Sequence, residues 1–520
     1  MHCGFSTCPG RTMGQKAELP FSFQHLSLPG GVRAAMKRNP TKIAASCNET
    51  QRTYTELVGR FDRVTSGILN DLGVASGQHA AIISKNCIEF VEIVLGSSQA
   101  GVGIATINPK LAPPELVAIC DDAEARVVFA DSDVAPVLRD QKFATVKTII
   151  EIGSEYEDWL AKQTPIAELP AVDEWDTFTI PYTSGTTGKP KGVLVTHRSR
   201  VIALYQISVE YGCFGPDDRF LAIAPICHGA GMAFVLAPIF FGGYVEITDK
   251  FDPEDVVRRF RESEITGFFG VPTHFNVIFT LEQEVLDKYR SETLHTIISN
   301  AAPLAQKMKE KIIGHFGQIL HETYGSTECG FVANLRTVDQ LRKVACVGQP
   351  FPGTLVEIRN PDGSECGPEE VGELFVTGPS LFNGYWNRPE ETAESYKDGW
   401  VTVGDLAKKD DEGHIYIVDR IKDMVITGGI NVYPREVEEA LIRHPEIIDI
   451  AVVGIPDEKW GEKLKAFVVR APGSELQDEG VIEYCDGKIS SVKTPKEVAF
   501  IDVMPRNASG KILKTELREM

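Results

Sequence analysis

The feature that most restricts the fold of this chain is the alternation of short apolar strands with helical segments. A helical pattern over residues 54–72 precedes an apolar strand at 80–83, and a helix at 88–100 leads to a strand at 103–107. The alternation continues as far as a strand at 319–323. Strands that alternate with helices predict a mainly parallel α/β sheet. In open sheets of this kind, ligand sites lie beyond the carboxyl ends of the strands.

The pattern changes after residue 355. Short β segments separated by Gly, Asp and Pro turns predict a β subdomain. A charged run follows at 419–423, and beyond it a helix near Pro434 and further strands predict a compact α+β unit. We therefore predict a disordered N-terminus at 1–20, a large α/β domain with a β subdomain at 21–420, and a small α+β C-terminal domain at 421–520.

Composition and charge narrow the class of protein. A length of 520 residues predicts more than one domain, and a net charge of −20 argues against a nucleic-acid partner. The 11 cysteines are dispersed without zinc spacing, which is typical of free thiols in a reducing cytoplasm. No apolar signal segment is present at the N-terminus. Residues 221–245 lack charges, but prolines and glycines interrupt them, so we predict buried segments and no membrane span.

A loop rich in glycine and hydroxyl side chains follows the predicted strand at 178–182. Glycines let the backbone approach a ligand, and successive N–H groups form a concave anion site. The loop differs from the common P-loop because Pro190 stands where a metal-binding Ser/Thr is expected. An ordinary surface turn is the alternative, but it rarely carries two lysines between apolar strands. The predicted polyphosphate contacts are Thr183, Ser184, Gly185, Thr186, Thr187, Gly188, Lys189 and Lys191.

Four further clusters carry residues suited to a nucleotide. In the first, Tyr324 can stack on a base, Thr327 can donate to a phosphate, and Glu328 can hold Mg²⁺. In the second, Asp405 follows a glycine and can accept two ribose hydroxyls. The third is the run at 419–434, and the fourth is the loop that carries Lys511. Taken singly, each cluster also fits a polar loop or a solvated side chain.

Together and in this order, these clusters resemble the AMP-forming adenylate-forming superfamily, from about residue 23 to 517. The run at 428–434, Gly-Gly-Ile-Asn-Val-Tyr-Pro, resembles the acyl-CoA and aryl-CoA synthetases. The resemblance implies ATP, Mg²⁺ and coenzyme A. It also implies two steps: a carboxylate attacks the α-phosphorus of ATP to form acyl-AMP and pyrophosphate, and the thiol of CoA then displaces AMP.

The resemblance also implies a role for each matched residue. The catalytic residues are Lys511, Glu328, Thr327 and His228, and Mg²⁺ is held by Glu328 and Thr186. Besides the phosphate loop, the nucleotide and CoA contacts are Ala301, Tyr324, Asp405, Arg420, Lys422, Gly428, Gly429 and Trp460. Lys511 bridges carboxylate and phosphate, and Trp460 and Lys496 are weaker matches for contacts to the CoA nucleotide. The resemblance further implies that residues 21–420 form the adenylation domain, and that residues 421–520 form a mobile lid that hinges at Lys422 between the two steps.

Substrate specificity is expected from an acyl pocket walled by residues 228–232, 269–272 and 299–302. The predicted substrate contacts are His228, Gly231, Val271, Asn300 and Gly325. Asn300 stands where members of the superfamily usually have glycine, which disfavours a long straight-chain tunnel. We therefore predict that the substrate is a compact or polar-substituted carboxylic acid, either a medium-size fatty acid or an aromatic acid. These walls show no obvious Arg or Lys, so dicarboxylates are disfavoured.

Two other functions stay open at this point. An adenylating enzyme could use a carrier protein or act on a luciferin, although no carrier domain follows Lys511 and the glycine pair suits CoA. A non-catalytic nucleotide-binding protein could share the fold, but it would be expected to lack Glu328, Lys511 or the loop lysines. The predicted partners are a carboxylic acid, ATP and CoA, and a homodimer is a further prediction.

Overall fold

The computed structural model of this chain describes residues 25–184, 190–506 and 512–520. Several predictions concern residues outside these ranges. They are the disordered N-terminus at 1–20, the loop residues Gly185, Thr186, Thr187, Gly188 and Lys189, and Lys511. The side chain of Ser184 also lies outside the description.

One sheet carries the phosphate-loop strand. Its strands are β3 (His79–Ile83), β4 (Gly103–Ile107), β5 (Ala125–Ala130), β6 (Thr148–Glu151), β7 (Thr177–Ser184), β8 (Pro190–Gly192) and β9 (Val195–Thr196). The strand order is β6-β5-β3-β4-β7-β8, with β9 beside the start of β7. The strands from β6 to β7 are parallel, whereas β8 and β9 run antiparallel to β7. Every residue of β3 and β4 is buried, as expected for parallel strands covered on both faces.

A second, nine-stranded sheet carries the other strand-end clusters. Its strands are β1 (Ile43–Cys47), β2 (Thr50–Thr53), β10 (Arg219–Ala222), β11 (Tyr244–Ile247), β12 (Gly267–Gly270), β13 (Thr296–Ser299), β14 (Leu320–Ser326), β15 (Gly330–Leu335) and β16 (Gln349–Pro350). The order is β16-β15-β14-β13-β12-β10-β11-β1-β2, and the six strands from β14 to β1 are parallel. Because β12, β13 and β14 are parallel neighbours, residues 271, 300 and 324 come to the same edge of the sheet.

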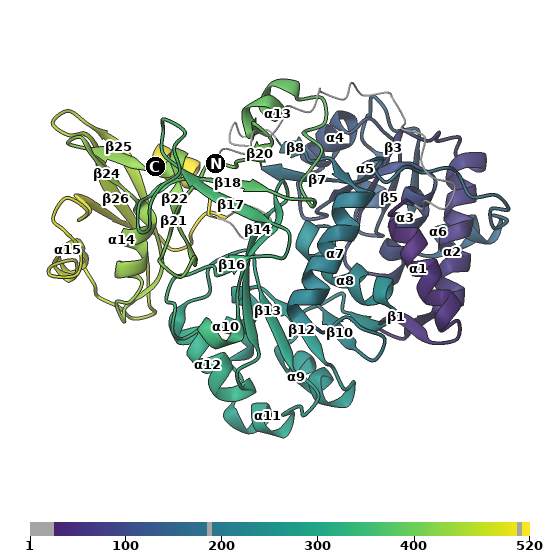
Figure 1. Cartoon of the computed structure of the whole chain (residues 1–520), viewed down its shortest axis with the longest axis horizontal. Helices are drawn as coiled ribbons and strands as arrows, with labels where there is room; N and C mark the ends of the chain where they lie inside the picture. Colours follow the sequence, from purple (N-terminus) through teal and green to yellow (C-terminus); the bar gives the residue numbers. More distant parts are fainter. Residues whose placement is uncertain (1–24, 185–189, 507–511) are drawn as a thin grey trace, which may run out of the picture.

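Helices cover both sheets and fill the space between them. They are α1 (Leu28–Arg38), α2 (Tyr54–Ser66), α3 (Ile88–Gln99), α4 (Pro113–Asp122), α5 (Ala135–Arg139), α6 (Ser154–Ala161), α7 (His197–Tyr211), α8 (Gly229–Phe241), α9 (Pro253–Glu262), α10 (Pro272–Ile278), α11 (Gln283–Lys288) and α12 (Gln306–Phe316). One apolar core joins α1, α2, α3, α7 and α8 to strands of both sheets (Figure 1).

Helix α8 explains the uncharged stretch at 221–245. The helix is apolar on all sides and ten of its 13 residues are buried, which is the pattern of a central core helix. Within the residues that the structure describes, no helix is long and apolar enough to cross a membrane.

The predicted β subdomain is an antiparallel sheet. It contains β17 (Leu355–Arg359), β18 (Gly372–Thr377), β19 (Tyr396–Lys397), β20 (Trp400–Val401), β21 (Asp405–Lys409) and β22 (Ile415–Arg420), with α13 (Pro389–Ser395) between β18 and β19. Strands β21 and β22 form a hairpin whose register sets Asp405 opposite Arg420. The pairing therefore brings the predicted ribose-binding carboxylate and Arg420, another predicted nucleotide contact, together.

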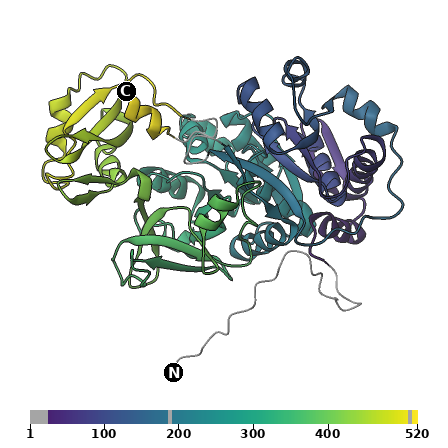
Figure 2. The same cartoon turned by 90° about the horizontal axis from the view of Figure 1, so that it is seen from above.

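The C-terminal part has its own sheet and its own apolar core. It contains the short 3₁₀ turn η3 (Ile421–Asp423), β23 (Val425–Thr427), β24 (Ile430–Val432), α14 (Pro434–Leu441), β25 (Ile447–Asp457), β26 (Gly461–Arg470), α15 (Asp478–Tyr484), β27 (Glu497–Phe500) and α16 (Lys514–Glu519). Figure 2 shows this part standing to one side of the two large sheets. The predicted fold class, a large α/β part with a smaller α+β part, is confirmed. The domain limits at 420 and 421 stay a prediction.

Three histidines should make the stability of the fold depend on pH. Burial lowers the pKa of His197, His274 and His321 from 6.5 to about 4. Between these values the unfolded chain binds more protons than the folded chain, so the free energy of unfolding falls as the pH falls from 6.5 towards 4. We expect a loss of up to about 1.4 kcal/mol per pH unit for each histidine. Urea unfolding at pH 7, 6 and 5 measures this loss, and His321→Gln should reduce the slope; an unchanged slope in that variant would contradict the assignment.

Candidate active site

A buried carboxylate links the ends of three strands. Asp405 accepts a hydrogen bond from the hydroxyl of Tyr324, and the Nε of Arg420 lies 3.1 Å from its other oxygen. Burial, and next the charge of Asp405, raise the pKa of Tyr324 well above its usual value, so the phenol stays a donor. Tyr324, Asp405 and Arg420 come from three separate sequence clusters, and in the fold they form one contact group. The group joins β14 of the nine-stranded sheet to the β21–β22 hairpin.

A second contact group joins Glu328 to the exit of the phosphate loop through Tyr385. The hydroxyl of Tyr385 donates to Glu328 Oε1 at 2.9 Å. The Nζ of Lys191 lies 5.2 Å from the centre of the Tyr385 ring, within cation–π range, and 3.8 Å from Glu391. Sequence reasoning missed Tyr385, because a lone tyrosine in the run Gly-Tyr-Trp carries no chemical signal. The pairing of β7 with β8 also sets Thr183 opposite Lys191.

The surroundings of Glu328 fit a magnesium ion that arrives with a nucleotide. Among residues 25–184, 190–506 and 512–520, no group of three His, Cys, Asp or Glu side chains could hold a metal by itself. Mg²⁺ prefers one or two carboxylates together with substrate phosphates and water, rather than a cage made by protein alone. One partly exposed carboxylate beside the phosphate-loop strands satisfies that preference. The second predicted ligand, Thr186, lies outside the described residues.

His228 stands at the N-terminus of α8, at the start of the first predicted acyl wall. Its Nε2 lies 3.4 Å from Asn108 Nδ2, beyond the end of β4. Burial lowers the pKa of His228, which favours the neutral imidazole at neutral pH. A neutral ring with a polar neighbour fits the predicted place beside a reacting carboxylate.

The third predicted wall contains strained backbone. Asn300 is buried directly after β13, and its side-chain oxygen accepts a hydrogen bond from the N–H of Ala301. Ala301 has φ +76°, a left-handed conformation that is uncommon for residues other than glycine. The side-chain oxygen of Asn300 therefore supports a tight turn, and its NH₂ group donates no hydrogen bond to the described residues.

Two predicted substrate contacts are glycines for reasons of packing. A Cβ at Gly231 would lie 2.3 Å from the carbonyl oxygen of Pro225, and one at Gly325 would lie 2.2 Å from that of Gly330. Close backbone approach alone accounts for glycine at both positions, so their contact with substrate stays a prediction. Val271 opens α10, and its N–H donates to Nδ1 of His274 at 3.2 Å.

The wall residues themselves include no Arg or Lys, as expected, but an arginine from another helix lies beside the first wall. Arg200 comes from α7, and its Nη1 donates to the carbonyl oxygen of Gly229 at 3.2 Å. Sequence reasoning missed this contact because the two residues lie 29 positions apart and meet only where α7 packs on α8.

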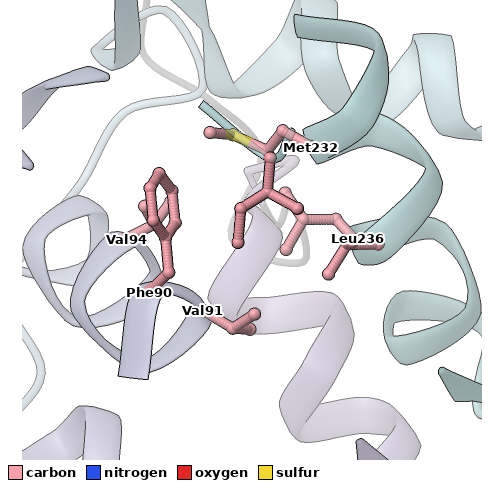
Figure 3. A pocket seen from close by; sticks show the side chains of 7 residues that line it. Phe90, Val91, Val94, Met232 and Leu236 are labelled. Carbon is pink, nitrogen blue, oxygen red and sulfur yellow. The ribbon is translucent and has the colours of Figure 1, made fainter. Parts of the chain in front are cut away.

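A small cavity lies behind the same wall, between α3 and α8. Figure 3 shows Phe90 and Val94 on one side of it and Met232 and Leu236 on the other. It is lined by Phe90, Val91, Val94, Ile226, Met232, Val235 and Leu236. An all-apolar lining offers no partner to a carboxylate, so we do not assign the reacting end of the substrate to this cavity.

The predicted CoA contacts gather at the β23–β24 hairpin. The N–H of Gly428 donates to the carbonyl oxygen of Trp460 at 2.8 Å, and a Cβ at Gly428 would lie 2.9 Å from the Trp460 ring. Gly428 and Gly429 both have positive φ, at +59° and +79°. Glycine is therefore favoured at both positions by conformation. Lys422 lies in η3, just before this hairpin.

Comparison with known proteins identifies the family. A model of the AMP-binding enzyme family matches residues 32–386. The chain belongs to this family. The C-terminal domain of the same enzymes matches residues 436–511. A feruloyl-CoA synthase from Amycolatopsis sp is 33% identical over 496 residues, which cover 93% of this chain and 96% of that protein.

Two further relatives support the same class of enzyme. A long-chain-fatty-acid–CoA ligase from Mycobacterium tuberculosis is 33% identical over 485 residues, covering 91% of this chain and 93% of that one. The crystal structure of ATP-bound MatB from Rhodopseudomonas palustris superposes with a TM-score of 0.87 at 30% identity, covering 95% and 99% of the two chains. The prediction of an AMP-forming acid–thiol ligase that uses ATP, Mg²⁺ and coenzyme A is confirmed.

Proposed function

We propose that this AMP-binding enzyme activates a compact, polar-substituted carboxylic acid and transfers it to coenzyme A. The observation that carries the proposal is Asn300, a buried polar side chain at the end of β13 where a straight apolar tunnel would need a small residue. A long alkyl chain packed there would leave the NH₂ group of Asn300 without a partner, which costs free energy. A feruloyl-CoA synthase and a long-chain-fatty-acid–CoA ligase are both relatives of this chain. Sequence similarity therefore does not show whether its substrate is an aromatic acid or a fatty acid.

The proposed chemistry divides among the contact groups described above. Asp405, supported by Arg420, accepts the ribose hydroxyls, and the Tyr324 ring lies against the adenine. Thr327 donates to the α-phosphate, and the loop from Thr183 to Lys191 holds the β- and γ-phosphates. Glu328 would hold the Mg²⁺ ion, which neutralises phosphate charge when it is bound.

In the first step a carboxylate oxygen forms a bond to the α-phosphorus, and the bond to pyrophosphate breaks. Lys511 bridges the two anions, and neutral His228 stands beside the acyl group. In the second step the sulfur of CoA, after losing its proton, attacks the acyl carbon and AMP leaves. Rotation about Lys422 brings Gly428 and Gly429 to the pantetheine arm and Trp460 to the CoA nucleotide.

A panel of acids tests the proposed substrate class. We expect kcat/KM, measured by pyrophosphate release, to be highest for substituted benzoates, cinnamates or C6–C10 acids. Asn300→Gly should raise kcat/KM for a C14 acid relative to cinnamate by about 10-fold or more, because it removes the buried amide. An optimum at C14 or longer in the unaltered enzyme would refute the proposal. Release of AMP without thioester formation would instead overturn CoA as the acceptor.

We also propose a cytoplasmic location and a homodimer. The nine cysteines that the structure describes are all free thiols, which suits a reducing compartment. Val338, Leu341 and Val344 are exposed apolar residues within one short segment, which suits contact with a second copy. Sedimentation of the purified protein would test the dimer.

A further inference from the structure

Arg200 is a buried guanidinium without a carboxylate partner in the described part of the chain. The residue is only 7% exposed, and its Nε is buried with no hydrogen-bond acceptor. Burial alone lowers its pKa to about 10, and no acidic group nearby offsets this shift. Arginine is rarely buried unless it is paired, because an uncompensated charge in the interior is costly.

The unused donors of Arg200 share one edge of its guanidinium. Nη1 is engaged with the carbonyl oxygen of Gly229, whereas Nε and Nη2 donate no hydrogen bond to residues 25–184, 190–506 or 512–520. The Nε–Nη2 edge is the one that matches the two oxygens of a carboxylate side by side. Arg198, two residues earlier on α7, shows the ordinary arrangement, because its Nη1 lies 3.0 Å from Glu174.

This edge borders the first wall of the predicted acyl pocket. A Cβ built on Gly229 would meet one atom within 4 Å, Nη2 of Arg200, at 3.7 Å. Apart from its chain neighbours and the backbone of its own helix, no other described atom lies that close to this position, so the guanidinium borders the space beside Gly229. Gly229 directly follows His228, the residue expected beside the reacting carboxylate. A second anion held by Arg200 would thus lie a short distance from the reacting end.

We propose that Arg200 binds a second carboxylate of the substrate, so that the enzyme prefers short dicarboxylic acids or carboxyl-substituted aromatic acids to their uncharged analogues. This inference rests on the proposed function and narrows its substrate class. The carboxylate would accept hydrogen bonds from Nε and Nη2 and would neutralise the buried charge. An uncharged acid would leave that charge unpaired, which is how a polar site rejects an analogue that lacks the matching group.

Matched pairs of acids test the preference in the full-length enzyme. Initial rates of pyrophosphate release would be measured for glutarate against pentanoate, adipate against hexanoate, and isophthalate against benzoate. We expect kcat/KM to favour at least one diacid by about 10-fold or more, mainly through a lower KM. Arg200→Met keeps the length of the side chain and should lower that diacid-to-monoacid ratio by about 30-fold, whereas Arg200→Lys should retain part of it.

Arg198→Met is the matched control, because it removes an arginine of the same helix that is already paired with Glu174. Its diacid-to-monoacid ratio should stay within about twofold of the unaltered enzyme. If Arg200→Met does not fold, the unfolding temperature (Tm) of the unaltered enzyme is measured instead, in the presence of ATP and one acid of a matched pair. A diacid should then raise the Tm more than the monoacid of equal length.

The outcomes separate this inference from the proposed function. Thioester formation from monoacids with no diacid turned over, or an unchanged ratio in Arg200→Met, would overturn the role of Arg200 and leave the CoA ligase intact. A panel in which no acid supports AMP release would overturn the proposed function, and the inference with it.

Discussion

Replacement of Lys511 by alanine should lower the rate of acyl-AMP formation by about 100- to 1,000-fold, because a positive group that stabilises developing charge between two anions is lost. The second step, measured as thioester formation from supplied acyl-AMP and CoA, should change by less than about fivefold, since its leaving group is already in place. Single-turnover measurements of the two half-reactions check this difference.

Lys488→Ala is the matched control for Lys511→Ala, because Lys488 is another lysine of the C-terminal part. Its Nζ donates to the carbonyl oxygen of Tyr484 at 3.0 Å and lies over the ring of the same residue. Both half-reactions should keep their rates in this variant. Equal loss of the two half-reactions in Lys511→Ala would refute a role confined to adenylation and would indicate a general effect on the C-terminal domain.

Replacement of Glu328 by glutamine should lower kcat for adenylation by about 100-fold or more, because the amide loses the charge that favours Mg²⁺. The concentration of Mg²⁺ needed for half-maximal pyrophosphate release should rise in parallel. Magnesium titration at fixed ATP measures both quantities. A fall in kcat with no change in the magnesium requirement would contradict the assignment of a metal ligand.

Tyr385→Phe tests how much the orientation of Glu328 contributes to the rate, because it leaves the charge of Glu328 unchanged. The substitution removes the hydroxyl that donates to Glu328 Oε1 at 2.9 Å and keeps both the carboxylate and the ring beside Lys191. We expect a loss of about 3- to 10-fold, the size of one hydrogen bond to a charged group that water can partly replace. A loss as large as that of Glu328→Gln would mean that the tyrosine itself takes part in the reaction.

The alternation of strands and helices predicted the α/β fold because apolar period and turn residues are local properties of the chain. This reasoning fails for helix α8. The helix is apolar on all sides, so its sequence does not indicate which side packs against which neighbour. The strand pairing could not be predicted in the same way. Asp405 and Arg420 come from two different clusters that the resemblance assigned to the nucleotide, and the register of the β21–β22 hairpin sets them opposite each other.

The sequence alone predicted the reaction class and the cofactors, because its short motifs occur in the same order as in the superfamily that it resembles. The roles of the individual site residues stay predictions. Only the tertiary structure showed which residues outside the motifs contact the residues within them. It brought Tyr385 to Glu328 across 57 positions and Arg200 to Gly229 across 29. Such contacts depend on how strands pair and helices pack, and a lone tyrosine or arginine has no local pattern that predicts its partner.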